Sequence, residues 1–312
     1  MSRAAPDLRS LLAKARQTSW ALHGKKLAVA TPGMFRVYGR KGRYPAVSLT
    51  GPNCQLGCEH CGGRLLETML PAQSPEELLQ LGRKLKEQGQ RGFLLSGGSD
   101  HAGRLPWARF LPAIEQVIEE TGLTVTAHVA RIDAAIAGAL KAAGVSQALI
   151  DVVGAEETAR QVLHLKDGLA AQKETMAALG EAGLEVVPHI ILGLHKGRFL
   201  GEEKALELVA GLNTKRVVFV VLMPLKHTPF AGLEPPAAED AVRFMAKARE
   251  ILPAPAHHLG CARPRGRYRA RLDALAVEAG INVLAIPSDA ALDKARELGV
   301  EVSQTDTCCS LV

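Results

Sequence analysis

The sequence predicts an α/β protein built on a complete or nearly complete (β/α)8 barrel of the TIM type, and three observations support this fold. From about residue 44, short apolar or β-branched runs alternate with longer helical patterns, which is typical of βα units and a parallel sheet. Eight such runs follow one another over roughly 250 residues, the number and length of a (β/α)8 barrel. Several helical stretches also end at a glycine, as helices often do.

The expected elements divide the chain into three parts. The expected strands are 46–50, 92–96, 124–128, 147–151, 185–192, 216–223, 257–260 and 282–286. The expected helices are 6–21, 75–88, 106–120, 134–143, 169–182, 203–212, 238–251 and 267–280. We expect an N-terminal extension over 1–43, the barrel over 44–302 and a cysteine-containing tail over 303–312. An open six-stranded sheet followed by a separate C-terminal unit gives nearly the same pattern and remains an alternative.

Composition limits the class of protein. The 312 residues are 47% hydrophobic, so they can bury a full core, and the net charge of +6 comes from scattered basic residues with only 4% aromatics. We expect a solvated surface with no nucleic-acid site, and at most a mild preference for anionic partners. No apolar run approaches the ~20 residues of a membrane span, and residues 1–26 lack the features of a signal peptide. We therefore expect a cytoplasmic protein whose six cysteines serve metal or redox chemistry.

Three of the cysteines lie in one glycine-rich loop after the first expected strand. Cys54, Cys58 and Cys61 have the spacing C-x3-C-x2-C. Three thiolates leave one iron of a [4Fe–4S] cube without a protein ligand, and a chelating small molecule can bind there. The alternatives are a set of buried thiols or a structural zinc site that uses His60 or a distant ligand. Zinc sites usually contain C-x2-C pairs, and no matching pair lies nearby.

This loop resembles the signature of the radical S-adenosylmethionine (SAM) superfamily. The resemblance implies a [4Fe–4S] cluster that binds SAM, with His60 where the family usually has an aromatic or histidine ring beside the adenine. Ser96, Gly97 and Gly98 end the second expected strand and resemble the family turn that receives the methionine amino group. The usual acidic residue of that turn is replaced by Ser99.

Residues 123–230 resemble biotin synthase strand by strand. The resemblance implies that Asp151 contacts the SAM ribose, that Ile191 borders the adenine, and that the segment containing Met223 pairs with the adenine edge. Arg131 follows the third expected strand, at the end where barrel enzymes concentrate their chemistry. It either holds the SAM carboxylate or pairs with Asp133.

The other three cysteines predict a second site. Cys261 follows the seventh expected strand, and Cys308 and Cys309 lie in the tail, where exposed thiols have little reason to occur. Together they can hold a second [4Fe–4S] cluster, with Ser310, solvent or a sulfide in the fourth position. Alternatively, Cys261 belongs to the core and the tail cysteines are incidental.

The combined pattern is most similar to the two-protein lipoyl synthases of archaea and some bacteria. Its features are the C-x3-C-x2-C loop, the segment 260–266 and the run Cys308-Cys309-Ser310. Biotin synthase has further cluster cysteines on earlier strands, but this chain has His128, Asp151 and His189 there, which implies a different auxiliary cluster.

The resemblance to lipoyl synthases implies a reaction and a set of partners. SAM is cleaved to a 5′-deoxyadenosyl radical, and sulfur from the second cluster is inserted into an octanoyl-derived chain. The implied partners are an octanoyl- or mercaptooctanoyl-lysyl protein, a ferredoxin or flavodoxin as electron donor, and a second radical SAM protein. Two alternatives remain: a biotin-synthase-like mutase or lyase with a single cluster, and a non-enzymatic iron–sulfur scaffold.

Overall fold

The structure is a computed structural model that describes residues 7–33, 35–37 and 39–312. Its strands are β1 (Lys26–Ala30), β2 (Arg36–Val37), β3 (Arg40–Lys41), β4 (Ala46–Ser48), β5 (Leu70–Pro71), β6 (Gly92–Ser96), β7 (Thr124–His128), β8 (Gln147–Asp151), β9 (Glu185–Leu192), β10 (Arg216–Val221), β11 (Ala256–Leu259), β12 (Val283–Ala285) and β13 (Glu301–Thr305). Its α-helices are α1 (Leu8–His23), α2 (Pro75–Glu87), α3 (Trp107–Thr121), α4 (Ala134–Ala142), α5 (Glu156–Gln161), α6 (Gly168–Glu181), α7 (Glu202–Ala210), α8 (Ala238–Ile251), α9 (Arg267–Glu278) and α10 (Asp289–Glu297), and the 3-10 helices are η1 (Arg64–Thr68) and η2 (Cys309–Leu311). None of the described helices is long and apolar enough to cross a membrane.

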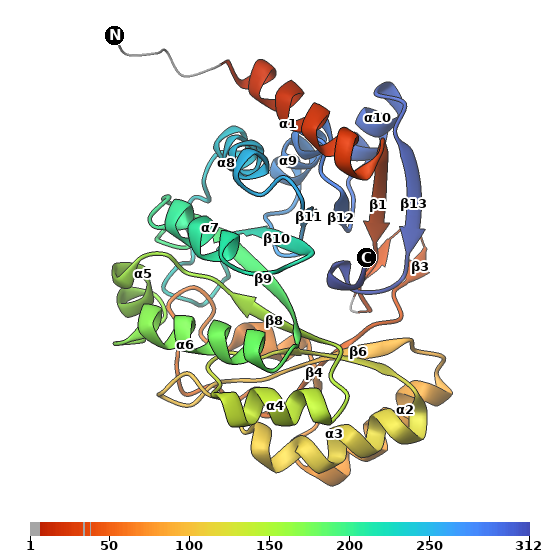
Figure 1. The fold of residues 1–312 in the computed structure, drawn as a ribbon, viewed down its shortest axis with the longest axis vertical. Helices are drawn as coiled ribbons and strands as arrows, with labels where there is room; N and C mark the ends of the chain where they lie inside the picture. The colour runs from red at the N-terminus through yellow and green to blue at the C-terminus, as the bar shows by residue number, and fades with distance from the viewer. Residues whose placement is uncertain (1–6, 34, 38) are drawn as a thin grey trace.

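A curled parallel sheet forms the centre of the molecule. Eleven strands lie side by side in the order β13-β1-β12-β11-β10-β9-β8-β7-β6-β4-β5, and each neighbouring pair is parallel. The helices cover the outside of the curl, while the segment that follows β13 turns back inside it (Figure 1). The carboxyl ends of the parallel strands therefore meet at one edge of the sheet, where α/β proteins place their ligands.

All eight expected strands are present, but the expected closed eight-stranded barrel is not confirmed. The sheet gains β5, β1 and β13, and its edge strands β5 and β13 are not paired with each other in the residues that the structure describes. It is a curled, open half-barrel. β1 comes from the first 43 residues and lies between β12 and β13, so these residues contribute to the sheet. At the opposite edge, Pro71 has no backbone N–H to donate to a further strand.

Burial on both faces explains why the central strands form. Val217, Val218 and Phe219 of β10 have no exposed surface, as expected for a parallel strand covered by helices on one side and by the curl on the other. The expected helix over 6–21 is α1, although residues 1–6 lie outside the described part of the chain. It is joined to the turn after α9 by Ser19, whose Oγ donates a hydrogen bond to the Gly280 carbonyl at 2.6 Å.

Candidate cluster and SAM site

A cavity of about 470 Å³ opens at the carboxyl ends of the strands. All of the site residues predicted from the sequence line it, and they come from three parts of the chain: the loop after β4, the ends of the middle strands, and the region from β11 onward. They are Cys54, Cys58, His60, Cys61, Ser96, Gly97, Gly98, Arg131, Asp151, Ile191, Met223, Cys261, Cys308 and Cys309.

The cysteine loop rests on the turn that follows β6. The Ser99 carbonyl accepts hydrogen bonds from the backbone amides of Gln55 and Leu56, at 2.9 and 3.3 Å. A Cβ atom added at Gly98 would lie 1.9 Å from the Asn53 carbonyl oxygen and 2.6 Å from the Cys54 Cα. Only glycine permits this approach, so the turn after β6 holds the loop in place.

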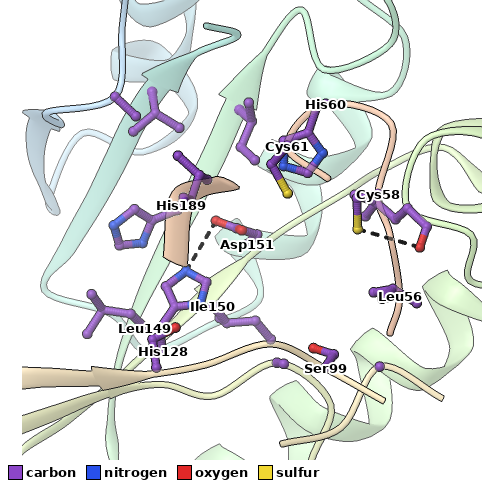
Figure 2. A pocket seen from close by; sticks show the side chains of 18 of the residues that line it. Leu56, Cys58, His60, Cys61, Ser99, His128, Leu149, Ile150, Asp151 and His189 are labelled. Carbon is purple, nitrogen blue, oxygen red and sulfur yellow. Dashed lines mark hydrogen bonds and ion pairs between the residues drawn. The ribbon is translucent and has the colours of Figure 1, made fainter. Parts of the chain in front are cut away.

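Cys58 and Cys61 of this loop influence each other's ionisation. The interaction with Cys58, followed by that with His60, lowers the pKa of Cys61 to about 4, and the interaction with Cys61 together with burial raises the pKa of Cys58. Burial works to lower the pKa of His60, but a hydrogen bond with Cys61 and the charge of Asp151 outweigh it, so the pKa of His60 is raised. The ring of His60 lies beside Cys61 at the cavity (Figure 2).

These residues fit the cluster that the sequence implies. Three soft sulfur donors from one loop line the same cavity, and thiolates are the ligands that iron–sulfur clusters use. The buried Nδ1 of His60 has no hydrogen-bond partner in the described structure, so it is available to a bound group. Within the described ranges, no three His, Cys, Asp or Glu side chains converge on a point that would suit a single metal ion.

Three polar side chains, those of His128, Asp151 and His189, lie together near the carboxyl ends of β7, β8 and β9. His128 Nε2 lies 3.5 Å from Asp151 Oδ1, and the ring centres of His128 and His189 are 5.9 Å apart in an edge-on arrangement (Figure 2). Burial works to raise the pKa of Asp151, but the charge of His128 outweighs it and lowers the pKa to about 2. The pKa of His128 is raised: burial opposes the charge of Asp151, and the charge wins.

A hydrogen bond to the backbone fixes which ring nitrogen of His189 carries the proton. Its Nδ1 donates a hydrogen bond to the Val187 carbonyl at 3.0 Å, since a carbonyl can only accept. Burial lowers the pKa of His189 to about 4, so the ring is neutral at pH 7 and its Nε2 carries a lone pair. The sequence predicted no role for His189 or His128. The sequence feature that could have identified them is a polar side chain in the second half of a buried parallel strand, close to the end that faces the site.

Arg131 lines the cavity, and its guanidinium group forms ion pairs with neighbouring carboxylates. It pairs with Asp167 at 3.0 Å and with Glu174 at 3.8 Å. The pairing with Asp133 that was an alternative is not the one observed, because the Asp133 carboxylate instead accepts a hydrogen bond from the Ile136 amide and caps α4.

The second set of cysteines reaches the same cavity from the opposite side. The Asp306 carboxylate anchors the tail between Arg43, at 2.5 Å, and Arg91, at 2.7 Å. Further along, the Ser310 carbonyl accepts a hydrogen bond from Arg216 Nη1 at 2.6 Å. Residues 306–310 are therefore held within the curl.

The three thiols interact with one another. A hydrogen bond with Cys309 lowers the pKa of Cys308 to about 6 and raises that of Cys309. Burial is the main cause that raises the pKa of Cys261, and the charge of Cys308 raises it further. Cys261 and Cys308 both pack against the apolar cluster that contains Cys309.

Arg263 has a structural role that its sequence context does not predict. It is fully buried, its guanidinium contacts Asp273, and its Nη1 donates to the Gly260 carbonyl at 2.6 Å. This contact holds the backbone next to Cys261. No local pattern reveals it, because Asp273 lies on the buried face of α9.

The chain is similar in sequence to known biotin synthases. A biotin synthase from Pelotomaculum thermopropionicum is 28% identical over 289 residues, which cover 89% of this chain and 83% of that protein. A biotin synthase from Nitrosopumilus maritimus is 26% identical over 208 residues, 64% of this chain and 62% of its own length.

Solved structures share the fold, and methylornithine synthase and HydG are two of them. Methylornithine synthase (PylB) has a TM-score of 0.64 at 15% identity, covering 97% of this chain and 91% of its own. HydG, a maturase of the [FeFe]-hydrogenase, has a TM-score of 0.69 at 17% identity, covering 96% and 70%. The model of the radical SAM superfamily matches residues 48–209, more than half of the sequence. On this match, the chain belongs to the radical SAM superfamily.

Proposed function

We propose that this chain is a sulfur-inserting radical SAM enzyme, one component of a two-protein lipoyl synthase. Membership of the superfamily implies a [4Fe–4S] cluster with SAM and a source of electrons. The observation that carries the further step is that Cys261, Cys308 and Cys309 line the same cavity as the first cysteine loop. Two sets of thiols across one cavity suit a substrate carbon held between a radical source and a sulfur source.

The residues of the chain have separate roles in this proposal. Cys54, Cys58 and Cys61 hold the first cluster, and Cys261 with the two tail cysteines holds the second. When bound, the first cluster with SAM supplies a 5′-deoxyadenosyl radical, and the second supplies sulfide. The chain itself orients the reactants and excludes water. Residues 303–312 form the part that closes the second site.

The resemblance to the radical SAM signature and to biotin synthase suggests the SAM-binding residues, and all of them line the cavity. Asp151 and Arg131 take the ribose and the carboxylate, His60 and Ile191 border the adenine, and the backbone near Met223 pairs with its edge. Ser96, Gly97 and Gly98 surround the methionine amino group. The reaction partners are an octanoyl- or mercaptooctanoyl-lysyl protein, a ferredoxin or flavodoxin, and a second radical SAM protein.

A second candidate is a biotin-synthase-like enzyme with a single cluster, such as a mutase or lyase. The similarity to two biotin synthases supports the biotin-synthase-like barrel of this candidate, but it does not bear on the number of clusters. Iron per chain separates the two candidates, since two cubes hold about eight irons and one cube about four. A non-enzymatic scaffold predicts no SAM cleavage in either case.

Two triple variants test the proposal. Replacing Cys54, Cys58 and Cys61 by Ala should leave a folded chain that makes no 5′-deoxyadenosine from SAM. Retained SAM cleavage by the anaerobically reconstituted variant would contradict the first site.

Replacing Cys261, Cys308 and Cys309 by Ala should halve the iron and leave SAM cleavage intact but uncoupled. Sulfur transfer to an octanoyl- or mercaptooctanoyl-lysyl peptide should be abolished. Full sulfur transfer by this variant, or only about four irons in the parent chain, would return the protein to the one-cluster class.

A further inference from the structure

The segment between α5 and α6, residues 162–167, packs against the first cysteine loop. The Glu59 amide donates a hydrogen bond to the Val162 carbonyl at 2.9 Å. The Cys58 thiol lies 3.8 Å from the Leu163 carbonyl, a contact drawn as a dashed line in Figure 2. Two consecutive carbonyls of this segment thus face the middle of the C-x3-C-x2-C motif.

His164 contacts the same loop through both nitrogens of its ring. Nδ1 lies 3.0 Å from the Leu56 carbonyl, and Nε2 lies 3.0 Å from the Glu59 Oε1 atom. Leu56 and Glu59 stand on either side of Cys58 in the loop. The imidazole therefore bridges the stretch of backbone that carries the central cysteine.

The backbone of His164 has an uncommon conformation. Its φ is +58°, in the left-handed region that few residues other than Gly adopt, although His, Asn and Asp do so more often than the rest. Strained residues of this kind persist where the surrounding contacts determine them, and they cluster at functional sites. His164 has this conformation while both of its ring nitrogens contact the cysteine loop.

The segment also reaches the other side of the cavity. Asp167, at its end, pairs with Arg131, and the Arg131 amide donates to the Gly103 carbonyl at 3.0 Å. A Cβ atom at Gly103 would lie 2.9 Å from Leu165 Cδ2, so the segment also packs closely on the loop after β6. Residues 162–167 therefore link the cysteine loop to the end of β7.

We propose that His164 is a positioning residue for the first cluster: it holds the loop from Leu56 to Glu59 so that Cys58 faces the cavity. This rests on the assignment of Cys54, Cys58 and Cys61 as cluster ligands. His164 does not touch the reacting groups. It acts by fixing the backbone on both sides of one ligand, as groups around metal sites commonly do.

Iron retention tests this proposal. The reconstituted parent chain and His164→Gly are mixed anaerobically with a ferrous chelator, and the loss of iron is followed by absorbance. Glycine accepts the positive φ, so the iron-free variant should melt close to the parent, whereas iron loss should be roughly 10- to 100-fold faster, the usual effect of removing a group that orients a ligand. His227→Gly is the matched control, since His227 is exposed and has a φ of +61°. It should lose iron at the parent's rate.

The outcomes separate this proposal from the assignment beneath it. If the parent holds its cluster and His164→Gly loses iron no faster than His227→Gly, His164 has no positioning role. If the parent binds no iron, both the cluster assignment and this proposal fall. If His164→Gly does not fold, Glu59→Ala decides in the same way, because it removes one of the two contacts of the ring without altering the backbone of residue 164.

Discussion

Arg263 and Asp273 form a fully buried ion pair directly behind Cys261. Nε lies 2.7 Å from Oδ1 and Nη2 lies 3.0 Å from Oδ2, and neither side chain has any exposed surface. Asp273 Oδ2 also accepts a hydrogen bond from the Ser288 amide at 3.0 Å. The pair therefore ties the loop of Cys261 to α9 and to the segment after β12.

Breaking this pair should destabilise the fold. Asp273→Ala leaves the charge of Arg263 buried without a partner, which typically costs about 3–5 kcal/mol. The control is Glu239→Ala, which removes the exposed partner of Arg271 and should cost less than about 1 kcal/mol. Urea denaturation measures both free energies of unfolding. Equal losses in the two variants would mean that the buried pair has no special role.

SAM affinity should depend on Asp151 and Arg131. Each Ala variant removes a charged partner at the cavity, and a lost hydrogen bond to a charged group corresponds to roughly 10- to 100-fold weaker binding. Iron content should not change, since neither residue lies in a cysteine loop. Equilibrium binding of SAM measures the effect, with Asp133→Ala as the control outside the cavity. Unchanged affinity in both variants would remove these residues from the SAM site.

The tail should loosen when its anchor is removed. Asp306→Asn takes away the charge that pairs with Arg43 and Arg91, so Cys308 and Cys309 should become more accessible. The measurement is the rate of alkylation of the two thiols in the iron-free chain, followed by mass spectrometry. Asp293→Asn breaks an exposed pair with Arg296 and should not change that rate. If both variants react like the parent, the ion pairs do not hold the tail.

Stability should fall as the pH is lowered from about 6.5 to about 4, in part because of His189. Burial lowers the pKa of His189 to about 4 in the folded state, while the unfolded chain has the ordinary value near 6.5. Between these values only the unfolded state binds the proton, so acid favours unfolding. His189→Gln should make this dependence shallower, as seen in unfolding midpoints across the range.

His128 provides the contrast, because its pKa is raised. Burial opposes this shift and the charge of Asp151 causes it, so His128 stabilises the fold below pH 6.5 and loses that effect as the pH rises through its folded value. His128→Gln should therefore lose stability mainly at low pH. Identical pH profiles for the parent and both variants would contradict these directions.

Local patterns made much of the fold and of the first site predictable. The eight central strands are apolar runs buried on both faces, and Cys54, Cys58 and Cys61 form a contiguous motif whose position after a strand fixes where it lies. These features are encoded within a few neighbouring residues. Their prediction needs no knowledge of what packs against them.

The parts that were not predicted depend on contacts between distant residues. β13 has the sequence EVSQT and is mostly exposed, so it lacks the apolar pattern of a strand and is defined by its pairing with β1. His164 looks like an ordinary loop residue until the loop of Leu56 and Glu59 is seen beside it. Non-local pairing of this kind leaves no periodic signal in the sequence.

The position of β1 between β12 and β13 sets an order for folding. β1 is synthesised before the other strands of the sheet, yet both of its neighbours are made after β11. β1 therefore has no partner strand until β12 and β13 have been translated. Pairing between strands so far apart in the sequence is slow. When β13 pairs with β1, the same step carries Cys308 and Cys309 into the curl, so we expect the second set of thiols to be assembled only in the last stage of folding.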